Sequence, residues 1–292
     1  MKLIDGKKIA EEIRASIAAQ VAEIIDAGEE PPHLSAVLVG NDPASESYVA
    51  GKEKACSNIG FTSSVYRLPE NTSQAKLIEV VDFLNNDPQI NGFIVQLPLP
   101  KHIDADEILQ RIDPSKDVDG FHPVNIGRMV LGLPAYLPAT PAGIMMLLEH
   151  MNIETSGKHC VVVGRSNIVG TPISILMSRK GNPGNCTVTL CHSKTENMEE
   201  ITRQADILIV AIGKPNFIKE NMVKSGAVVI DVGIHRIEDE SVKGYHIVGD
   251  VDFDRVAAKC SYITPVPGGV GPMTIIGLLM NTMKSYRKEI YK

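Results

Sequence analysis

Apolar residues recur along the first 96 positions in two alternating patterns, one typical of helices and one typical of buried strands. Between residues 6 and 27, isoleucine and valine recur every three or four positions, which predicts a helix. The short apolar run at 35–39 predicts a buried strand. After it, Asp42 and Pro43 predict a helix that ends near Gly60, because Asp caps helix N-termini and Pro suits the first helical position. The other elements predicted in this half are strands at 61–67 and 92–96 and a helix at 73–86.

Residues 98–140 break this pattern. Prolines recur throughout the segment, and they disfavour long helices and central strands. We therefore expect a loop, a short helix and a linker between two domains. Beyond residue 140 the alternation resumes, with a surface loop at 181–185 that is rich in Gly, Pro and Asn. The strands predicted here are 159–163, 187–191, 207–211, 227–231 and 261–263, and the helices are 168–180, 196–204, 252–259 and 273–288.

Length and alternation together predict the fold class. A chain of 292 residues is longer than one compact core usually supports, so two domains are expected. Alternating strands and helices of these lengths form βαβ units around a parallel sheet. We therefore expect two α/β domains, the second of them a Rossmann-like, doubly wound parallel sheet.

Composition narrows the range of functions. Hydrophobic residues make up 43% of the chain and charged residues 22%, as in an ordinary globular protein. The formal net charge of -6 and the absence of Trp argue against a nucleic-acid partner. The five cysteines form no CxxC pair and indicate reduced thiols, and the eight histidines are not spaced as metal ligands, so no metal is expected. Because no apolar run reaches roughly 18 residues, we expect a cytoplasmic protein with no membrane step.

The segment 161–172 carries the main sign of a cofactor. It reads as an apolar strand, a tight turn at Gly164 and the start of a helix. This is a variant of the dinucleotide-binding fingerprint, with Ser166 where the second glycine usually lies. A helix start offers backbone N–H groups and the positive end of its dipole to a pyrophosphate. The alternative is an ordinary turn between strand and helix that carries a surface arginine.

The next strand indicates which nucleotide would bind. NAD sites usually end this strand in Asp or Glu, which accepts from the ribose 2′-OH. Here the strand 187–191 leads into the stretch 192–195, which holds Ser193 and a lysine but no carboxylate, and Arg165 follows the preceding strand. These groups suit a 2′-phosphate, which favours NADP. Glu196 argues against this interpretation unless it only occupies the first turn of a helix, where acids are favoured.

Several polar residues in the N-terminal half are candidates for chemistry. Tyr48 and Lys52 are four positions apart on one predicted helix and share a face, although most such pairs are ordinary surface residues. Gln96 ends a predicted buried strand, where ligands bind in open α/β sheets, but its role could be to hydrogen-bond loop backbone. Asp117 and Asp119 lie in a loop where Asp is common for turn geometry alone.

Several stretches together resemble one family, the bifunctional methylenetetrahydrofolate dehydrogenase/methenyltetrahydrofolate cyclohydrolases. The similarity covers almost the whole chain in the order typical of the family. The stretches are SESYVAGK at 45–52, VQLPLP at 95–100, KDVDGF at 116–121, GRS and IVG within 164–170, CHSKT at 191–195, DVGI at 231–234 and TPVPGGVGPMT at 264–274. The second and last of these are very specific, whereas the loop at 181–185 looks longer than usual.

The resemblance implies two reactions. The first transfers hydride from 5,10-methylenetetrahydrofolate to NADP and gives the 5,10-methenyl cation. The second adds water to that cation and gives 10-formyltetrahydrofolate. The resemblance also implies a homodimer, with a folate-binding catalytic domain of residues 1–139 plus 273–292, an NADP-binding domain of residues 140–272, and a cleft between them.

The resemblance further implies roles for individual residues. Asp119 would accept from the pterin N–H and amino groups, and Tyr48 would stack on the substrate. Lys52, held by a hydrogen bond to Gln96, would handle the proton of the attacking water. These four would be the catalytic residues. The other folate contacts would be Val95, Leu97, Pro267, Gly268, Gly269, Val270 and Gly271. The NADP contacts would be Gly164, Arg165, Ser166, Ser193 and Ile234.

Three alternatives remain open. A dehydrogenase of the same family without the hydrolytic step is possible, although Lys52 and Gln96 argue against it. An enzyme like shikimate dehydrogenase would share the two-domain plan, but the stretches at 95–100 and 264–274 disfavour it. A non-catalytic sensor that binds a dinucleotide would not need the set of Tyr48, Lys52, Gln96 and Asp119.

Overall fold

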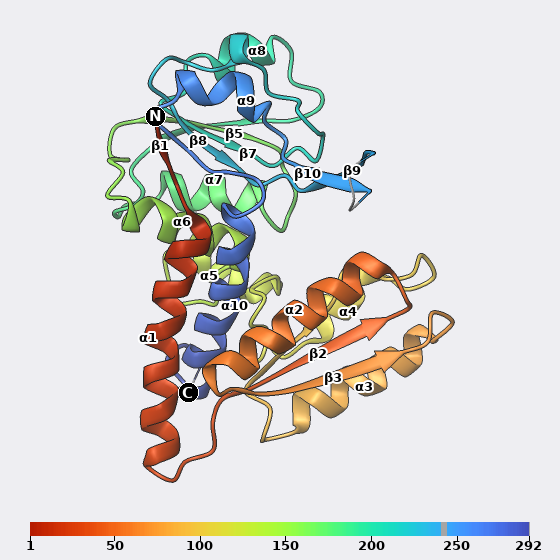
Figure 1. Ribbon diagram of the computed structural model, residues 1–292. Coiled ribbons are helices and arrows are strands. Elements are labelled where there is room, and N and C mark those ends of the chain that lie inside the picture. The colour runs from red at the N-terminus through yellow and green to blue at the C-terminus, as the bar shows by residue number, and fades with distance from the viewer. Residues whose placement is uncertain (241–243, 292) are drawn as a thin grey trace. The chain divides into compact units, whose positions relative to one another are not determined.

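The structure, a computed structural model, describes residues 1–240 and 244–291. The chain divides into two compact units, one formed by residues 1–11 and 140–274, the other by residues 12–139 and 275–292. We call them the six-stranded and the three-stranded unit after their main sheets. Each sheet is parallel and carries helices, which confirms the predicted α/β fold class (Figure 1). The assignment of folate and NADP to separate domains stays a prediction, because a compact unit is a geometric grouping.

The three-stranded unit is layered around a central strand. Its elements are most of α1 (Gly6–Asp26), β2 (His33–Val39), α2 (Pro43–Ile59), β3 (Thr62–Leu68), α3 (Gln74–Asn86), β4 (Gly92–Val95), α4 (Ala105–Arg111), α5 (Pro123–Val130) and most of α10 (Val270–Tyr286). The sheet order is β3-β2-β4. Leu34, Ala36 and Leu38 of β2 pack with residues of α1, α2 and α10, whereas Val37 and Val39 pack with α3 and α4. β2 is a nearly continuous apolar run because helices cover both faces of the sheet.

Local signals set the ends of α2 as predicted. The carboxylate of Asp42 accepts from the N–H of Ser45 at 2.8 Å, and Pro43 occupies the first helical position. Gly60 closes the helix with a φ of 83°, a left-handed conformation that suits glycine. Because α2 follows β2 directly, its first turns begin at the carboxyl end of the sheet.

The segment 98–140 is more regular than predicted. It contains two helices, α4 and α5, and a third helix, α6 (Ala139–His150), begins at its end. The prediction of one short helix and a linker was therefore wrong. The error came from treating every proline as a helix breaker. Pro123 occupies the first turn of α5, where a helix has no hydrogen bond to lose. His122 caps this turn, and its Nδ1 accepts from the N–H of Val124 at 3.1 Å.

The six-stranded unit has a fully parallel sheet with the order β1-β11-β8-β7-β5-β6. Besides α6, its elements are β1 (Lys2–Leu3), β5 (His159–Val163), α7 (Gly170–Ser178), β6 (Thr187–Cys191), α8 (Met198–Thr202), β7 (Ile207–Val210), β8 (Val228–Asp231), β9 (His235–Glu238), β10 (Tyr245–Val248), α9 (Phe253–Val256) and β11 (Tyr262–Ile263). Figure 1 shows α7 on one face of the sheet and α8 and α9 on the other. The sheet is therefore doubly wound, as predicted.

Three features of the six-stranded unit were not predicted. Strand β1 is only two residues long and pairs in parallel with β11, Lys2 beside Tyr262, so no local pattern marks it. The antiparallel hairpin β9–β10 stands apart from the main sheet. Helix α10 begins at Val270 and not near Met273, since Pro272 lies in its first turn, where N–H groups need no helical partner. No helix in the described ranges is both long and apolar enough to span a membrane.

Candidate active site

Lys52 and Gln96 meet at the carboxyl edge of the three-stranded sheet. Lys52 extends from α2, and its Nζ donates to Oε1 of Gln96 at 3.1 Å. Gln96 directly follows β4, and its Nε2 donates to the carbonyl of Leu97 at 2.6 Å. That second bond turns the amide oxygen toward the lysine. The hydrogen bond expected between the two side chains is therefore present.

Tyr48 lies one helical turn before Lys52. Its side chain is 52% exposed, whereas the adjacent Val49 is fully buried in the core. Val49 and Lys52 line the same small cavity between α2 and the sheet, so Lys52 lies on the inner side of the helix, and Tyr48 lies beside it at the exposed edge of that face. A large aromatic ring exposed to this degree offers a flat face for stacking.

The two loop aspartates have different surroundings. Asp117 is buried, and its carboxylate accepts from the N–H groups of Gly120, Phe121 and His122 and from the amide of Asn125, at 2.8–3.2 Å. Burial raises the pKa of Asp117 to about 7, although these hydrogen bonds oppose the shift. Asp117 therefore holds the shape of its own loop.

Asp119 is half-buried, and no hydrogen bond to its carboxyl is found within the described part of the chain. Burial raises the pKa of Asp119, and the positive charge of Lys52 opposes that shift. The Asp119 carboxyl thus combines two properties of a ligand-binding group, since it is partly desolvated and has both oxygens available as acceptors.

The turn after β5 has the close packing of a dinucleotide-binding turn. Gly164 has a φ of 124°, and a Cβ at this position would overlap the carbonyl oxygen of Ala211. A Cβ on Gly170, the first residue of α7, would overlap the carbonyl oxygen of Gly164. Both positions therefore require glycine, because strand, turn and helix approach one another so closely.

Ser166 replaces the second glycine of the fingerprint and lies in the turn before α7. Its Oγ accepts from the N–H groups of Val169 and Gly170 at 3.2 and 3.3 Å. Among the described residues, none accepts from the backbone N–H groups of residues 165–168. Successive N–H groups at a helix start bind anions, so this turn fits the pyrophosphate of a dinucleotide.

Arg165 and Ser193 follow the ends of neighbouring parallel strands. The N–H of Gly164 donates to the carbonyl of Cys191 at 2.9 Å, which ties the two strand ends together. Both Arg165 and Ser193 are exposed. Glu196 lies two residues before α8, so the prediction that it occupies the first helical turn was wrong. The acids of that turn are Glu199 and Glu200.

The remaining predicted contacts lie at the start of α10 and after β8. Gly268 has a φ of 103°, and its carbonyl accepts from the N–H of Lys7 at 2.9 Å, which fixes the turn. Val270 and Gly271 form the first turn of α10 and are not part of a free loop. Ile234 is 46% exposed directly after the turn that follows β8, a degree of exposure that suits contact with a ligand.

Sequence reasoning missed two buried aspartates in the six-stranded unit, Asp231 and Asp250. Both accept hydrogen bonds from the loops that follow the sheet strands. The contacts that hold them are tertiary and could not be read from the sequence, since each lies close to a glycine from the other's segment. A Cβ on Gly233 would overlap the Asp250 carboxyl, and a Cβ on Gly249 would overlap that of Asp231.

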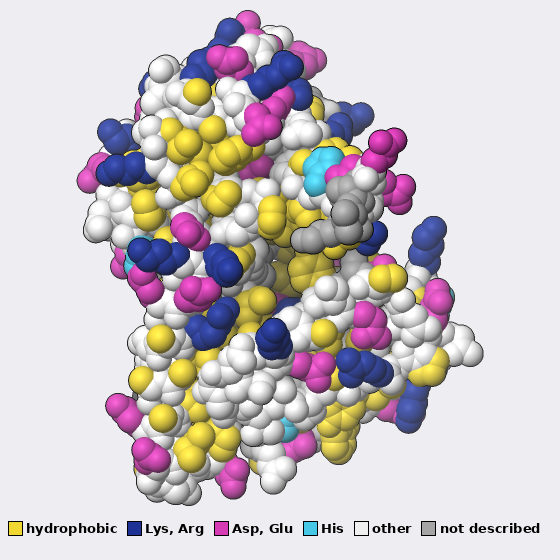
Figure 2. Space-filling model, in the orientation of Figure 1, with side chains coloured by type: hydrophobic (Ala, Val, Ile, Leu, Met, Phe, Trp, Pro, Cys, Tyr) yellow, Lys and Arg dark blue, Asp and Glu magenta, His cyan; other side chains and the backbone are white. Residues whose placement is uncertain are grey.

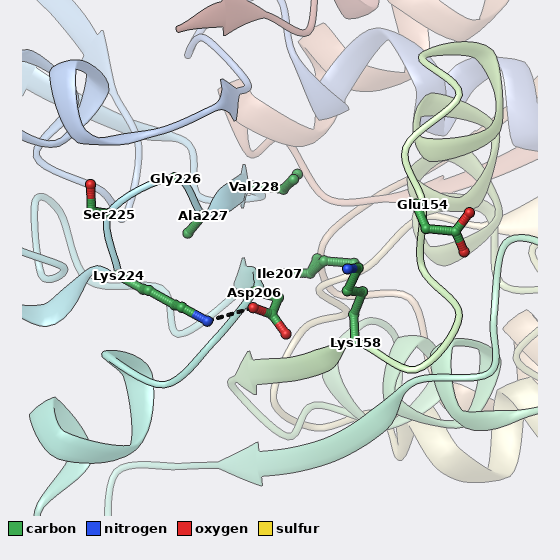
Figure 3. Close-up of a pocket in the computed structure, with 9 residues that line it drawn as sticks. All are labelled: Glu154, Lys158, Asp206, Ile207, Lys224, Ser225, Gly226, Ala227 and Val228. Atoms are coloured by element: carbon green, nitrogen blue, oxygen red, sulfur yellow. Dashed lines mark hydrogen bonds and ion pairs between the residues drawn. The ribbon is translucent and has the colours of Figure 1, made fainter.

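A pocket of about 180 Å³ lies at the opposite edge of the six-stranded sheet (Figure 3). Its walls come from the starts of β7 and β8 and from the loop before β5. Inside it, Lys224 Nζ reaches Asp206 Oδ1 at 2.6 Å, while Glu154 and Lys158 line the other side (Figure 3). Ligands of open α/β sheets bind at the carboxyl ends of the strands, so this pocket is not where a dinucleotide is expected.

On the face drawn in Figure 2, basic and acidic side chains are interspersed, and neither kind forms a large patch. Within the described ranges, no three His, Cys, Asp or Glu side chains are arranged to hold a metal ion. The five cysteines are buried and unpaired.

Two family models match the chain. The tetrahydrofolate dehydrogenase/cyclohydrolase catalytic domain matches residues 4–119, and the NAD(P)-binding domain of the same family matches residues 138–290. The chain belongs to the tetrahydrofolate dehydrogenase/cyclohydrolase family. The Lys52–Gln96 pair and Asp119 lie within the first matched range, and the glycine turn at 164–170 lies within the second.

Relatives of this family match the chain over its whole length. The bifunctional protein FolD of Cytophaga hutchinsonii is 59% identical over 286 residues, which cover 98% of this chain and 99% of the relative. A solved structure of the bifunctional enzyme FolD from Campylobacter jejuni is 48% identical, with a TM-score of 0.92 over 99% of both chains. The FolD structure from Trypanosoma brucei, in complex with NADP cofactor and inhibitor, is 37% identical, with a TM-score of 0.93 over 99% of this chain and 98% of the other.

Proposed function

We propose that this protein oxidises 5,10-methylenetetrahydrofolate with NADP and hydrolyses the resulting 5,10-methenyl cation to 10-formyltetrahydrofolate. The observation that carries the proposal is the hydrogen bond from Lys52 to Gln96, together with the Asp119 carboxyl, to which no described residue donates, in a member of the dehydrogenase/cyclohydrolase family. Residues 1–139 with 273–292 bind the folate, and residues 140–272 bind NADP. The protein is thus both an oxidoreductase and a hydrolase of one-carbon metabolism.

Folate binding orients the one-carbon unit for hydride transfer. The Asp119 carboxylate accepts from the adjacent N–H and amino groups of the pterin, and Tyr48 stacks on the aromatic part of the substrate. Further contacts come from Val95, Leu97 and the segment Pro267–Gly271. Loss of hydride leaves a cation delocalised over two nitrogens, so no enzyme base takes part and positioning dominates this step.

The residues of the six-stranded unit fit NADP. The N–H groups at 165–168, from which no residue of the described part of the chain accepts, suit the pyrophosphate, while Arg165 and Ser193 suit the 2′-phosphate, which an acid at that strand end would repel. Gly164 allows the close approach, Ser166 shapes the turn and Ile234 supplies an apolar contact. The bound cofactor supplies the acceptor for the hydride.

Hydrolysis of the methenyl cation requires proton handling. When water attacks the methenyl carbon, a C–O bond forms and the water must lose a proton. The Lys52 amine accepts that proton while one of its N–H bonds remains directed at Gln96. The remaining O–H proton is then transferred to the ring nitrogen as the formyl C=O bond forms and the C–N bond breaks, and the proton held by Lys52 passes to solvent. Gln96 thus acts by orienting Lys52.

A coupled assay tests the proposal. The protein is mixed with 5,10-methylenetetrahydrofolate and NADP, and absorbance follows NADPH and the methenyl chromophore. We expect NADPH to form while the methenyl species stays low because it is hydrolysed. Absence of NADPH would overturn the proposal in favour of a non-catalytic dinucleotide sensor. NADPH with lasting methenyl accumulation would indicate a dehydrogenase without the hydrolytic step.

We also propose that the protein is a cytoplasmic homodimer without a nucleic-acid or membrane partner. Five buried, unpaired cysteines are typical of a reducing compartment, and the net charge of -6 does not favour nucleic acid. Light scattering after size-exclusion chromatography tests the assembly. A mass near 31.6 kDa, that of one chain, would exclude the dimer.

A further inference from the structure

Asp250 is a fully buried carboxyl that holds two separate loops of the six-stranded unit. Its Oδ2 accepts from the N–H groups of Ile212 and Gly213, at 2.8 and 2.9 Å. Its Oδ1 lies 2.7 Å from Nε2 of His235, the first residue of β9. One side chain therefore links the turn after β7 to the segment after β8.

Both loops lie where the strands end, on the cofactor-binding edge of the sheet. The turn after β7 begins with Ala211, whose carbonyl oxygen fills the space that a Cβ on Gly164 would occupy. The segment after β8 carries Ile234, which is exposed directly before His235. Asp250 thus braces two of the surfaces against which a dinucleotide would lie: the turn packed on Gly164 and the segment that presents Ile234.

Asp231 fixes Asp250 in turn. Oδ1 of Asp231 accepts from the N–H groups of Asp250 and Gly233, and Oδ2 accepts from that of Val251, all at 2.9–3.0 Å. The N–H of Asp231 donates to the hydroxyl of Thr264 at 2.8 Å. The orientation of Asp250 is therefore fixed by several bonds at once.

Keeping two carboxyls inside this unit has an energetic cost. Burial raises the pKa of Asp231 to about 6, even though three backbone N–H groups oppose the shift. Buried acids are costly unless they are fully hydrogen-bonded, and simple turns form without them. A cluster of this kind at the strand ends is typical of a site whose geometry must be held.

We propose that Asp250 is a positioning residue for NADP, acting through the turn at 211–213 and through His235 on Ile234. This inference rests on the proposed function. Asp250 does not touch the cofactor itself. It holds in place the two loops against which the cofactor would lie, so its loss should affect both cofactor binding and hydride transfer.

Three variants test the inference. Asp250→Ala leaves the N–H groups of Ile212 and Gly213 without an acceptor, so the turn loosens. We expect kcat/KM for NADP in the dehydrogenase reaction to fall by about 100-fold. We also expect NADPH to bind more weakly in a fluorescence titration. Asp250→Asn keeps an oxygen for the two N–H groups and an amide N–H for a neutral His235, so it should restore most of the affinity.

The third variant, His235→Ala, tests the inference even if Asp250→Ala does not fold. It removes only the link to Ile234, and the His235 side chain is 20% exposed, so the unit should fold. We expect NADPH binding to weaken by less than in Asp250→Ala. Asp206→Ala is the matched control, because Asp206 accepts from the N–H of His159 and from Lys224 at the opposite edge of the same sheet. It should lower the Tm and leave NADPH binding unchanged.

The outcomes are distinguishable. Wild-type affinity for NADPH in folded Asp250→Ala, or in His235→Ala if the first variant does not fold, would overturn the inference. Equal weakening in the Asp206→Ala control would also overturn it, because the effect would then be general loosening. A wild-type protein that does not bind NADPH would overturn the proposed function itself, and this inference with it.

Discussion

Two aspartates only two positions apart, Asp117 and Asp119, are distinguished by their hydrogen-bond partners. The sequence could place both in one loop. Spacing and turn rules could not rank them, and only the family resemblance singled out Asp119, because the N–H donors that saturate Asp117 come from the path of residues 120–125, which no spacing rule fixes. The Lys52–Gln96 bond was easier to predict from the sequence. A helix that follows one strand and the end of a neighbouring strand meet at the same edge of a parallel sheet.

Asp119→Asn should weaken folate binding and lower both activities together. The substitution keeps the size of the side chain but places a donor against the donors of the pterin. A lost bond to a charged group corresponds to about 10- to 100-fold in affinity. Titration calorimetry with tetrahydrofolate and the two separate assays measure this. Asp117→Asn is the matched control and should lower the Tm with little change in folate affinity. Normal folate binding by Asp119→Asn would assign Asp119 to the turn alone.

Lys52→Met should separate the two reactions. Methionine keeps the apolar stem and removes the amine, so cyclohydrolase activity should fall by about 10²–10⁴-fold while measurable dehydrogenase activity remains. The methenyl intermediate should then accumulate. Gln96→Ala should act in the same direction but less selectively. Hydrolysis at the wild-type rate in Lys52→Met is the result that excludes a proton-handling lysine. Equal loss of both activities with normal folate binding would mean that Lys52 organises the site for both steps.

Among the elements, the ones predicted best are those with strong local signals. Helix α2 has its cap, its proline and its terminal glycine, and the buried strands are short apolar runs between breakers. Helices α5 and α6 were missed because prolines in their first turns resembled linker signals. β1 was missed because its partner β11 lies far away in the sequence. The β9–β10 hairpin pairs neighbouring segments, but each of its strands is only four residues long, so the local pattern is weak.

The paired ends of β5 and β6 predict the cofactor preference. Arg165→Ala should weaken NADP binding by about 1.5–3 kcal/mol, the range for a hydrogen bond to a charged group, and should change NAD binding much less. Dehydrogenase kcat/KM measured with each nucleotide gives the two effects. Arg203→Ala, at the far end of α8, removes another exposed arginine and should leave both values unchanged. If NADP and NAD lose equally, Arg165 binds the pyrophosphate that both share.

On the scale of the whole molecule, carboxyls are buried in both units, and burial raises the pKa of three of them. Asp117 rises to about 7, Asp231 to about 6, and Asp119 shifts in the same direction. In an unfolded chain such groups titrate near pH ~4. The folded protein therefore binds more protons than the unfolded chain between those values, and the stability that this supplies is lost as the pH rises through 6–7.

We accordingly expect the Tm to fall between about pH 5 and about pH 8 at constant ionic strength. Burial lowers the pKa of His33, which makes stability rise with pH. This single group is outweighed by the three carboxyls whose pKa is raised. Calorimetric melts across this range measure the trend, and Asp117→Asn should make it shallower. A Tm that rises steadily over the same range would show that Asp117 and Asp231 stay ionised in the folded protein.

The pairing of β1 with β11 bears on how the protein is made. Lys2 and Leu3 lie far upstream of their partners Tyr262 and Ile263, so β1 cannot pair until the long stretch of chain between them has been synthesised. The core of the three-stranded unit also stays incomplete during this time, because Leu278 and Leu279 of α10 are part of it. A nascent chain therefore cannot finish either unit before β11 and α10 have been synthesised, and it keeps apolar surface exposed until then. We expect the growing polypeptide to need chaperones during that time.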